Sequence, residues 1–271
     1  MIYCIWYPSG GFGHFINSIL NVHGRNFARP KNQSINFGNN GNAHLVELVA
    51  PKYFHDPDTY NFKFDRVQNY SVLIDNGINN EGERFKTVFA DAAVIKLCYS
   101  NNSWPIVART MIDKAGKLTL LDQLPVDTDK WSQNEPWAQR EKYFLYLRDH
   151  NLRSAWKPSS GTHNLMIDQL LIYDYLCERL TKFGIELDDF REVWTQWRQV
   201  NHTYIDPVTN ALGVLHKVKN NIDQNLDYID NLWAQAVLYY FLWTEFGQEV
   251  PHNDYANFFL TTSEIRKWLK L

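Results

Sequence analysis

Three nearly continuous apolar stretches stand out in the first 115 residues of this 271-residue chain, at Ile2–Tyr7, 71–74 and Ala92–Cys98. Buried strands of a parallel sheet have this pattern, because helices cover both faces of such a sheet. More than a dozen residues separate successive stretches, as crossover connections require. The pattern predicts an α/β fold with a mainly parallel central sheet, in which the first and third stretches are adjacent or near-adjacent parallel strands.

Apolar residues at helical spacing follow the first strand from Phe15 to Val22 and dominate the second half of the chain. We expect a helix at 104–114 that Ser103 caps and Gly116 ends, then helices at 135–152, 163–183, 187–200, 221–246 and 264–271. Trp194 and Trp197 fall on an apolar stripe that is typical of helix packing. Residues 25–43 are predicted to be a loop, and 44–49 a short strand or a turn of helix. The whole is expected to be one domain, with a sheet core at 1–115 and a helical extension at 116–271 packed on it.

A glycine-rich turn, Pro8-Ser9-Gly10-Gly11-Phe12-Gly13, joins the first strand to the first helix. Such a turn presents backbone N–H groups at a helix N-terminus, where phosphates and other anions are stabilised. No Gly-Lys pair follows, and the third glycine of a dinucleotide fingerprint is missing, so neither of those two motifs is present. The alternative is a tight strand-to-helix turn in which glycine serves only to allow positive φ.

Composition narrows the class of protein further. The net charge is −3 and no long basic run exists, so a nucleic-acid partner is not expected. The three cysteines are far apart and form no C-x-x-C pair, so neither a zinc site nor a disulfide framework is indicated. The short apolar start lacks a basic leader region, and no run of about 18 apolar residues exists. We therefore expect a cytoplasmic protein that uses no metal and contacts no membrane.

Two strand–turn–helix units, at Ile2 to Leu20 and at Ala93 to Met111, together resemble the sulfotransferase superfamily. Tyr7-Pro8-Ser9-Gly10-Gly11 lies where that family has Tyr-Pro-Lys-Ser-Gly, and residues 97–101 lie where it has two apolar residues and Arg-Asn-Pro. The resemblance implies a P-loop-like fold, with 3′-phosphoadenosine 5′-phosphosulfate as donor and a small molecule or glycan as acceptor. Carried over to this chain, it implies donor-binding residues at Ser9, Gly10, Gly11, Phe12, Gly13, His14, Tyr99, Asn101, Ser103 and Arg109.

The chain departs from the family at two cationic positions, since Ser9 replaces the donor-loop lysine and Tyr99 replaces the arginine of the second turn. His14 is the nearest candidate for the lost lysine, and Arg109 for the lost arginine. A neutral imidazole in the first helical turn can donate to a sulfuryl oxygen, so His14 is a candidate catalytic residue. Asp75, at the end of a predicted strand, is the candidate base for the acceptor hydroxyl.

Two further histidines, His44 and His55, are candidates to line the acceptor site. Two other functions stay open. The sequence Gly-Gly-Phe-Gly-His-Phe is similar to the Gly-Gly-Leu-Gly-Asn-Gln loop of some fucosyltransferases, which suggests a nucleotide-sugar glycosyltransferase. The third possibility is a P-loop-like protein that has lost catalysis and binds a nucleotide or a partner, an idea that the two missing cations favour.

Overall fold

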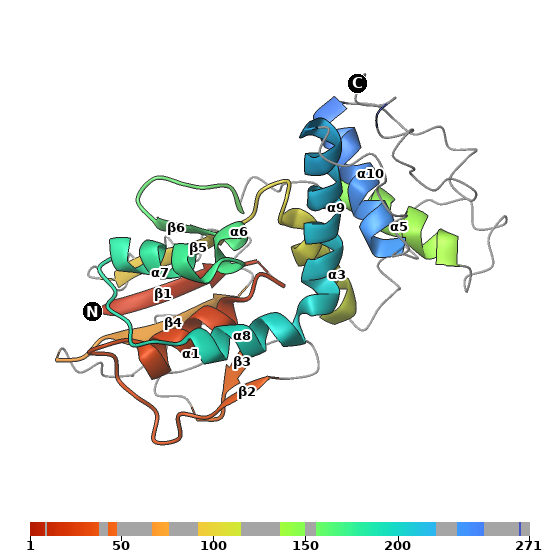
Figure 1. Cartoon of the computed structure of the whole chain (residues 1–271). Coiled ribbons are helices and arrows are strands. Elements are labelled where there is room, and N and C mark those ends of the chain that lie inside the picture. The colour runs from red at the N-terminus through yellow and green to blue at the C-terminus, as the bar shows by residue number, and fades with distance from the viewer. Residues whose placement is uncertain are drawn as a thin grey trace. The chain divides into compact units, whose positions relative to one another are not determined.

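A computed structural model describes residues 1–8, 10–37, 43–47, 67–75, 92–114, 136–149, 156–220, 232–246 and 266. The chain forms two compact units (Figure 1). The first unit consists of residues 1–100 and 152–201, and the second of residues 101–151 and 202–271. Among the described residues, no helix combines the length and the apolar character needed to cross a bilayer.

The first unit is built on a four-stranded parallel sheet in the order β4 (Tyr70–Asp75), β1 (Ile2–Tyr7), β5 (Ala92–Cys98) and β6 (His163–Met166). β1 pairs with β4 on one side and with β5 on the other, and β5 pairs with β6. The predicted parallel sheet is confirmed, and so is the prediction that the first and third apolar stretches are neighbouring parallel strands. The carboxyl ends of β1 and β5 therefore lie at the same edge.

Both faces of β1 are buried. Successive side chains of a strand point to opposite faces, and all residues from Tyr3 to Tyr7 are 6% exposed or less. On one face, Tyr3 contacts Phe27 with ring centroids 5.3 Å apart, whereas on the other Trp6 contacts Trp156 at 5.5 Å. Burial of both faces explains the continuous apolar pattern of β1.

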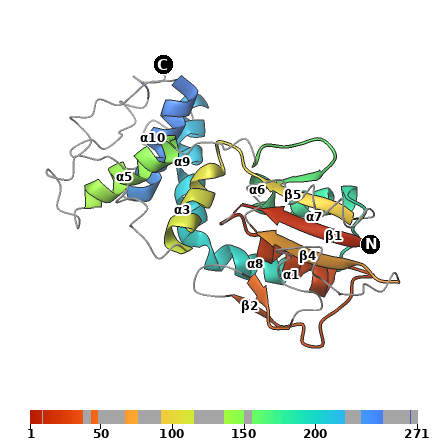
Figure 2. The same ribbon diagram turned by 180° about the vertical axis from the view of Figure 1, so that it is seen from behind.

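Helix α1 (Gly13–His23) packs against β1, β4 and β3. In Figure 2 it lies beside β4. β3 (Ala43–Leu45) forms a short antiparallel pair with β2 (Ile35–Phe37). Of the two alternatives for residues 44–49, the strand is confirmed at His44 and Leu45; residues 46 and 47 are not in a strand, and 48 and 49 lie outside the described residues. The prediction that residues 25–43 are a loop is wrong at β2, because the backbone of β2 is hydrogen-bonded to β3.

The single helix predicted at 163–183 is also wrong. Residues His163–Met166 form β6, Ile167–Leu170 form the short α6, and only Tyr173–Lys182 form a regular helix, α7. β6 is extended because its backbone completes the sheet beside β5. Arg179 of α7 also donates from Nη2 to the carbonyl oxygen of Asn164 at 2.9 Å, which ties the helix to the strand. Gly184, with φ of 78°, follows the helix, and glycine adopts this left-handed conformation without steric cost.

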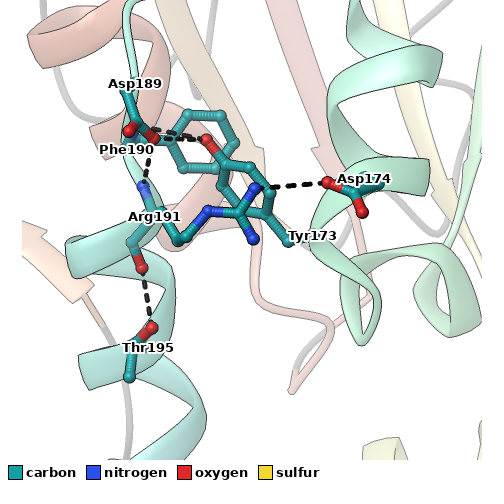
Figure 3. Close-up of polar contacts among 6 residues, drawn as sticks. All are labelled: Tyr173, Asp174, Asp189, Phe190, Arg191 and Thr195. Atoms are coloured by element: carbon teal, nitrogen blue, oxygen red, sulfur yellow. Dashed lines mark hydrogen bonds and ion pairs between the residues drawn. The ribbon is translucent and has the colours of Figure 1, made fainter.

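A polar cluster joins α7 to α8 (Arg191–Val200), the last helix of the first unit (Figure 3). The Tyr173 hydroxyl donates to Asp189 Oδ1 at 2.7 Å, and the Arg191 backbone N–H donates to the same oxygen at 3.0 Å. The Arg191 guanidinium lies 4.0 Å from the centroid of the Tyr173 ring and pairs with Asp174. Asp189 thereby satisfies an N–H group at the start of α8. The helix begins at Arg191 rather than at 187, because Leu187 forms an isolated antiparallel bridge with Gly24.

The second unit is helical in its described residues, with α3 (Trp104–Lys114), α5 (Pro136–Asp149), α9 (His202–Asn220) and α10 (Leu232–Phe246). α3 packs against α5 and α9, and α10 packs against the same two helices. Two bonds join α3 to α5, from Trp104 Nε1 to the Leu147 oxygen at 3.0 Å and from the Tyr143 hydroxyl to the Pro105 oxygen at 2.6 Å. The helix predicted at 104–114 is confirmed, and the one predicted at 135–152 is confirmed over Pro136–Asp149, the part of that range that the structure describes.

α9 is a helix that the sequence analysis missed, and it contains Pro207. The helix predicted at 221–246 is confirmed from Leu232 onward, whereas residues 221–231 lie outside the described part of the chain. Of the helix predicted at 264–271, only Arg266 is described, and it is helical. Gly116 also lies outside the described residues.

Candidate functional site

The glycine-rich turn is a tight connection between β1 and α1. The Gly11 N–H donates to the Pro8 oxygen at 2.7 Å and closes a four-residue turn whose third residue, Gly10, has φ of 81°. Phe12 then adopts a left-handed conformation, with φ of 62°, and α1 begins at Gly13. Ser9, a predicted donor contact, lies outside the described residues.

Two glycines of this turn are required by packing. A Cβ atom on Gly11 would lie 2.7 Å from the Pro8 ring, and one on Gly13 would lie 2.2 Å from the Tyr7 ring. Both distances are far below a normal van der Waals contact, so a larger residue at either position would displace the turn. The glycine pattern that suggested an anion site therefore has a steric cause of its own.

Phe12 is held in its left-handed conformation by an aromatic cluster. Trp197 of α8 stacks on Phe15 with ring centroids 4.3 Å apart, and meets Phe12 edge to face at 5.2 Å. All three side chains are 1% exposed or less. Trp197 thus belongs to a packing stripe, as the sequence suggested, and it packs against the glycine-rich turn and the start of α1.

His14 lies in the first turn of α1 and is 8% exposed. Its ring centroid is 4.3 Å from that of His44 on β3, and 5.8 Å from that of Tyr7 at the end of β1. The structure therefore brings together two histidines that the sequence analysis had assigned to catalysis and to the acceptor site. His55, the other acceptor candidate, lies outside the described residues.

A buried polar stripe continues from His14 along α1 through Asn17, Ser18 and Asn21, which share one helix face. Ser18 Oγ is within hydrogen-bond distance of the oxygen of His14, at 2.8 Å, and of Ala43 on β3, at 3.1 Å. Asn17 Oδ1 accepts from Ser71 Oγ of β4 at 2.7 Å and from Asn21 Nδ2 at 3.2 Å. These contacts fix β3, and with it His44, against the N-terminal half of α1.

Asp75 is the last residue of β4 and the register partner of Tyr7. Its backbone is therefore at the carboxyl edge of the sheet, next to the strand that leads into the glycine-rich turn. The prediction that Asp75 ends a strand is confirmed, and its catalytic role stays a prediction.

The turn after β5 contributes Tyr99 and Ser100 to the same edge of the first unit. Tyr99 is buried, and Ser100 Oγ donates to both carboxylate oxygens of Asp168, at 3.1 and 2.8 Å. Asp168 follows β6, so it also belongs to the carboxyl edge. The sequence does not single out Asp168, because the apolar residues of β6 continue into the helical spacing of the segment that follows.

The other predicted donor contacts, Asn101, Ser103 and Arg109, belong to the second unit. Ser103 directly precedes α3, and its carbonyl oxygen accepts from the N–H groups of Ile106 and Val107. The Arg109 guanidinium lies 3.5 Å from the ring centroid of Trp233 on α10, which is a cation–π contact within the helical unit.

A buried lysine on β5 was also missed. Lys96 is 3% exposed; its Nζ donates to the Lys157 oxygen at 2.8 Å and lies 4.8 Å from the Trp6 ring centroid. Nearby, burial raises the pKa of the Cys98 thiol to about 11, although Lys96 lowers it. Cys98 is therefore protonated at neutral pH and is a poor nucleophile. Within the described residues, no group of three or more histidine, cysteine or acidic side chains could hold a metal.

Comparison of the chain with protein-family models, curated proteins and solved structures finds no match in any of the three. The function proposed below therefore depends on the residues of the site and their arrangement.

Proposed function

We propose that the first unit binds a nucleotide phosphosulfate donor and transfers its sulfuryl group to a hydroxyl or amine, as a divergent sulfotransferase. The observation that carries this proposal is the strand order. β4 lies on one side of β1 and β5 on the other, so the order reverses between β1 and β5. In open parallel sheets, ligands bind at the carboxyl edge at such a switch point. The glycine-rich turn and the Tyr99–Ser100 turn flank that point.

His14 and Asp75 have distinct roles in this proposal. The acceptor oxygen attacks sulfur, the bond from sulfur to the 5′-phosphate oxygen breaks, and the acceptor proton passes to the Asp75 carboxylate. His14 donates a hydrogen bond to the sulfuryl group as charge moves onto the leaving phosphate. Its close contact with His44 supports an acceptor that enters beside β3.

The test uses 3′,5′-adenosine bisphosphate, the product nucleotide, in calorimetric titrations of the whole chain, together with sulfuryl transfer to a panel of acceptors. His14→Ala should lower kcat about 10²-fold, and Asp75→Asn should lower it roughly 10²- to 10⁴-fold. Both variants should still bind the bisphosphate, because their roles lie mainly in the transition state. His202→Ala, at an exposed histidine of α9, is the matched control and should leave both kcat and bisphosphate binding unchanged.

Gly11→Val and Gly13→Val are poor tests of anion binding, because both would displace the turn even without a ligand. The same contacts favour a second candidate function, a protein that keeps this turn for packing and binds a nucleotide without transferring a group. Bisphosphate binding with no transfer to any acceptor would support that second function. Binding of a nucleotide sugar in place of the bisphosphate would contradict both and favour a glycosyltransferase.

A further inference from the structure

The second unit contains a pocket of about 430 Å³ between α9 and α10, beside the turn that precedes α3. Its volume is at the small end of the range for ligand sites, which favours a small molecule. The residues that matter for its chemistry are Asn101, Leu215, His216, Lys219, Phe241 and Glu245. All of them belong to the second unit.

The pocket combines an apolar floor with a rim that carries both charges. Leu215 and Phe241 are about 5% exposed and form the floor. Lys219 of α9 and Glu245 of α10 form an ion pair at the rim, with side chains 42% and 39% exposed. Because one charge of each sign is present, the rim has no net preference for an anion or a cation.

His216 supplies a further donor. Asn220 Nδ2 donates to the His216 backbone oxygen at 2.8 Å and lies 3.2 Å from His216 Nδ1. The amide nitrogen carries two N–H bonds, so one can donate to the backbone oxygen while the other faces Nδ1. In the neutral tautomer in which Nδ1 accepts from Asn220, Nε2 carries the proton and the ring can donate from Nε2.

We propose that this pocket binds a small zwitterion, an α-amino acid with an apolar side chain. The ligand carboxylate pairs with Lys219 and accepts from His216, the ligand ammonium pairs with Glu245, and the side chain covers Leu215 and Phe241. Exposed ion pairs contribute little to stability. Breaking the Lys219–Glu245 pair so that each side chain pairs with the ligand therefore costs little free energy. The ligand keeps both charges paired and removes apolar area from water.

The ligand requirement is tested by calorimetric titration of the whole chain with L-phenylalanine and L-leucine. Two analogues of phenylalanine each lack one charge: 3-phenylpropanoate has no ammonium, and 2-phenylethylamine has no carboxylate. Both should bind at least tenfold more weakly than L-phenylalanine, since a hydrogen bond to a charged group is lost. Glycine, which has both charges and no side chain, should also bind more weakly.

Lys219→Gln and Glu245→Gln should each weaken L-phenylalanine binding about tenfold or more. Both positions are exposed, so the variants should keep the wild-type melting temperature to within a few degrees, which shows that they fold. The matched control is Lys182→Gln, which removes an exposed ion pair with Glu178 in the other unit and should leave binding unchanged.

The proposal is overturned if neither amino acid binds, if an analogue with one charge binds as tightly as L-phenylalanine, or if both rim variants bind like the wild type. None of these outcomes decides whether a nucleotide binds, because Lys219 and Glu245 belong to the second unit and the proposed transfer depends on His14 and Asp75 of the first.

Discussion

Gly13 shows at the scale of one residue how a steric contact can produce a functional-looking motif. Its Cα faces the Tyr7 ring so closely that a methyl group would lie 2.2 Å from it. Tyr7 in turn contacts His14, the first candidate catalytic residue. The absence of a side chain at position 13 therefore allows β1 and α1 to approach each other where the proposed site is built.

Gly13→Ala should destabilise the protein by roughly 1–3 kcal/mol, the usual cost of forcing extra volume into a packed core. The matched control is Gly213→Ala, in the interior of α9, where a Cβ atom would have no neighbour within 4 Å. That change should stabilise the protein by up to about 1 kcal/mol, because alanine favours the helix. Urea denaturation measures both. Equal effects of the two substitutions would contradict the steric explanation.

At this scale the sequence predicts a residue's local role better than its partners. Positive φ at Gly10 follows from the turn, and burial of Trp197 follows from the stripe on α8. The contact between His14 and His44 does not follow from the sequence. It depends on β3 being held against α1 by Ser18, and thus on tertiary structure across 30 residues.

At the scale of elements, the contact between α7 and α8 depends on one proton, that of the Tyr173 hydroxyl, which donates to Asp189. A hydrogen bond from Tyr173 is the largest cause that lowers the pKa of Asp189. Burial first, and then the bond to Asp189, raise the pKa of Tyr173 well above its ordinary value. The hydrogen bond between the two side chains (Figure 3) therefore favours the state with the proton on tyrosine and the charge on aspartate.

Tyr173→Phe should consequently reduce stability most between about pH 5 and pH 9. The lowered pKa of Asp189 gives stability above the ordinary aspartate pKa of about 3.9, which is lost as the pH falls through the folded-state value. The raised pKa of Tyr173 gives stability below about pH 10, which is lost as the pH rises further.

Urea denaturation from pH 3 to pH 11 measures the free energy of unfolding of wild type and Tyr173→Phe. The difference between the two free energies should become smaller at both ends of this pH range. Tyr175→Phe, at a half-exposed tyrosine of the same helix, is the control. Its difference from wild type in free energy of unfolding should not change with pH. A pH-independent difference for Tyr173→Phe as well would rule out the proton-dependent contact.

Helices and strands were predictable where the apolar pattern is long and turn or capping residues mark its ends, as for β1, β5, α3 and α5. β6 is only four residues long, and its apolar residues merge with the helical spacing of α7, so strand and helix could not be separated. α9 was missed because Pro207 and several polar residues interrupt its pattern. Its buried face is formed by packing against α3 and α10.

On the scale of the whole molecule, the chain leaves the first unit after residue 100 and returns to it at residue 152. The returning segment brings β6, which pairs with β5, and Trp197, which covers Phe12 and Phe15. Sheet edge and aromatic cluster thus depend on residues that lie far from the glycine-rich turn in sequence. The order of apolar stretches along the chain does not predict this dependence, because it does not indicate which later segment packs on the first unit.

A fragment of residues 1–151 should therefore fail to fold, whereas residues 1–201 with 101–151 replaced by a flexible Gly/Ser linker should keep the sheet. The fragment lacks β6 and Trp197, and loss of a buried tryptophan alone costs about 3–5 kcal/mol, a large part of the 5–15 kcal/mol typical of a domain. The linker variant retains every described strand of the first unit. Far-UV circular dichroism and amide dispersion in a proton–nitrogen NMR spectrum distinguish the two outcomes. A folded 1–151 fragment would show that β6 and the aromatic cluster are dispensable, and an unfolded linker variant would show that the first unit requires the helical one.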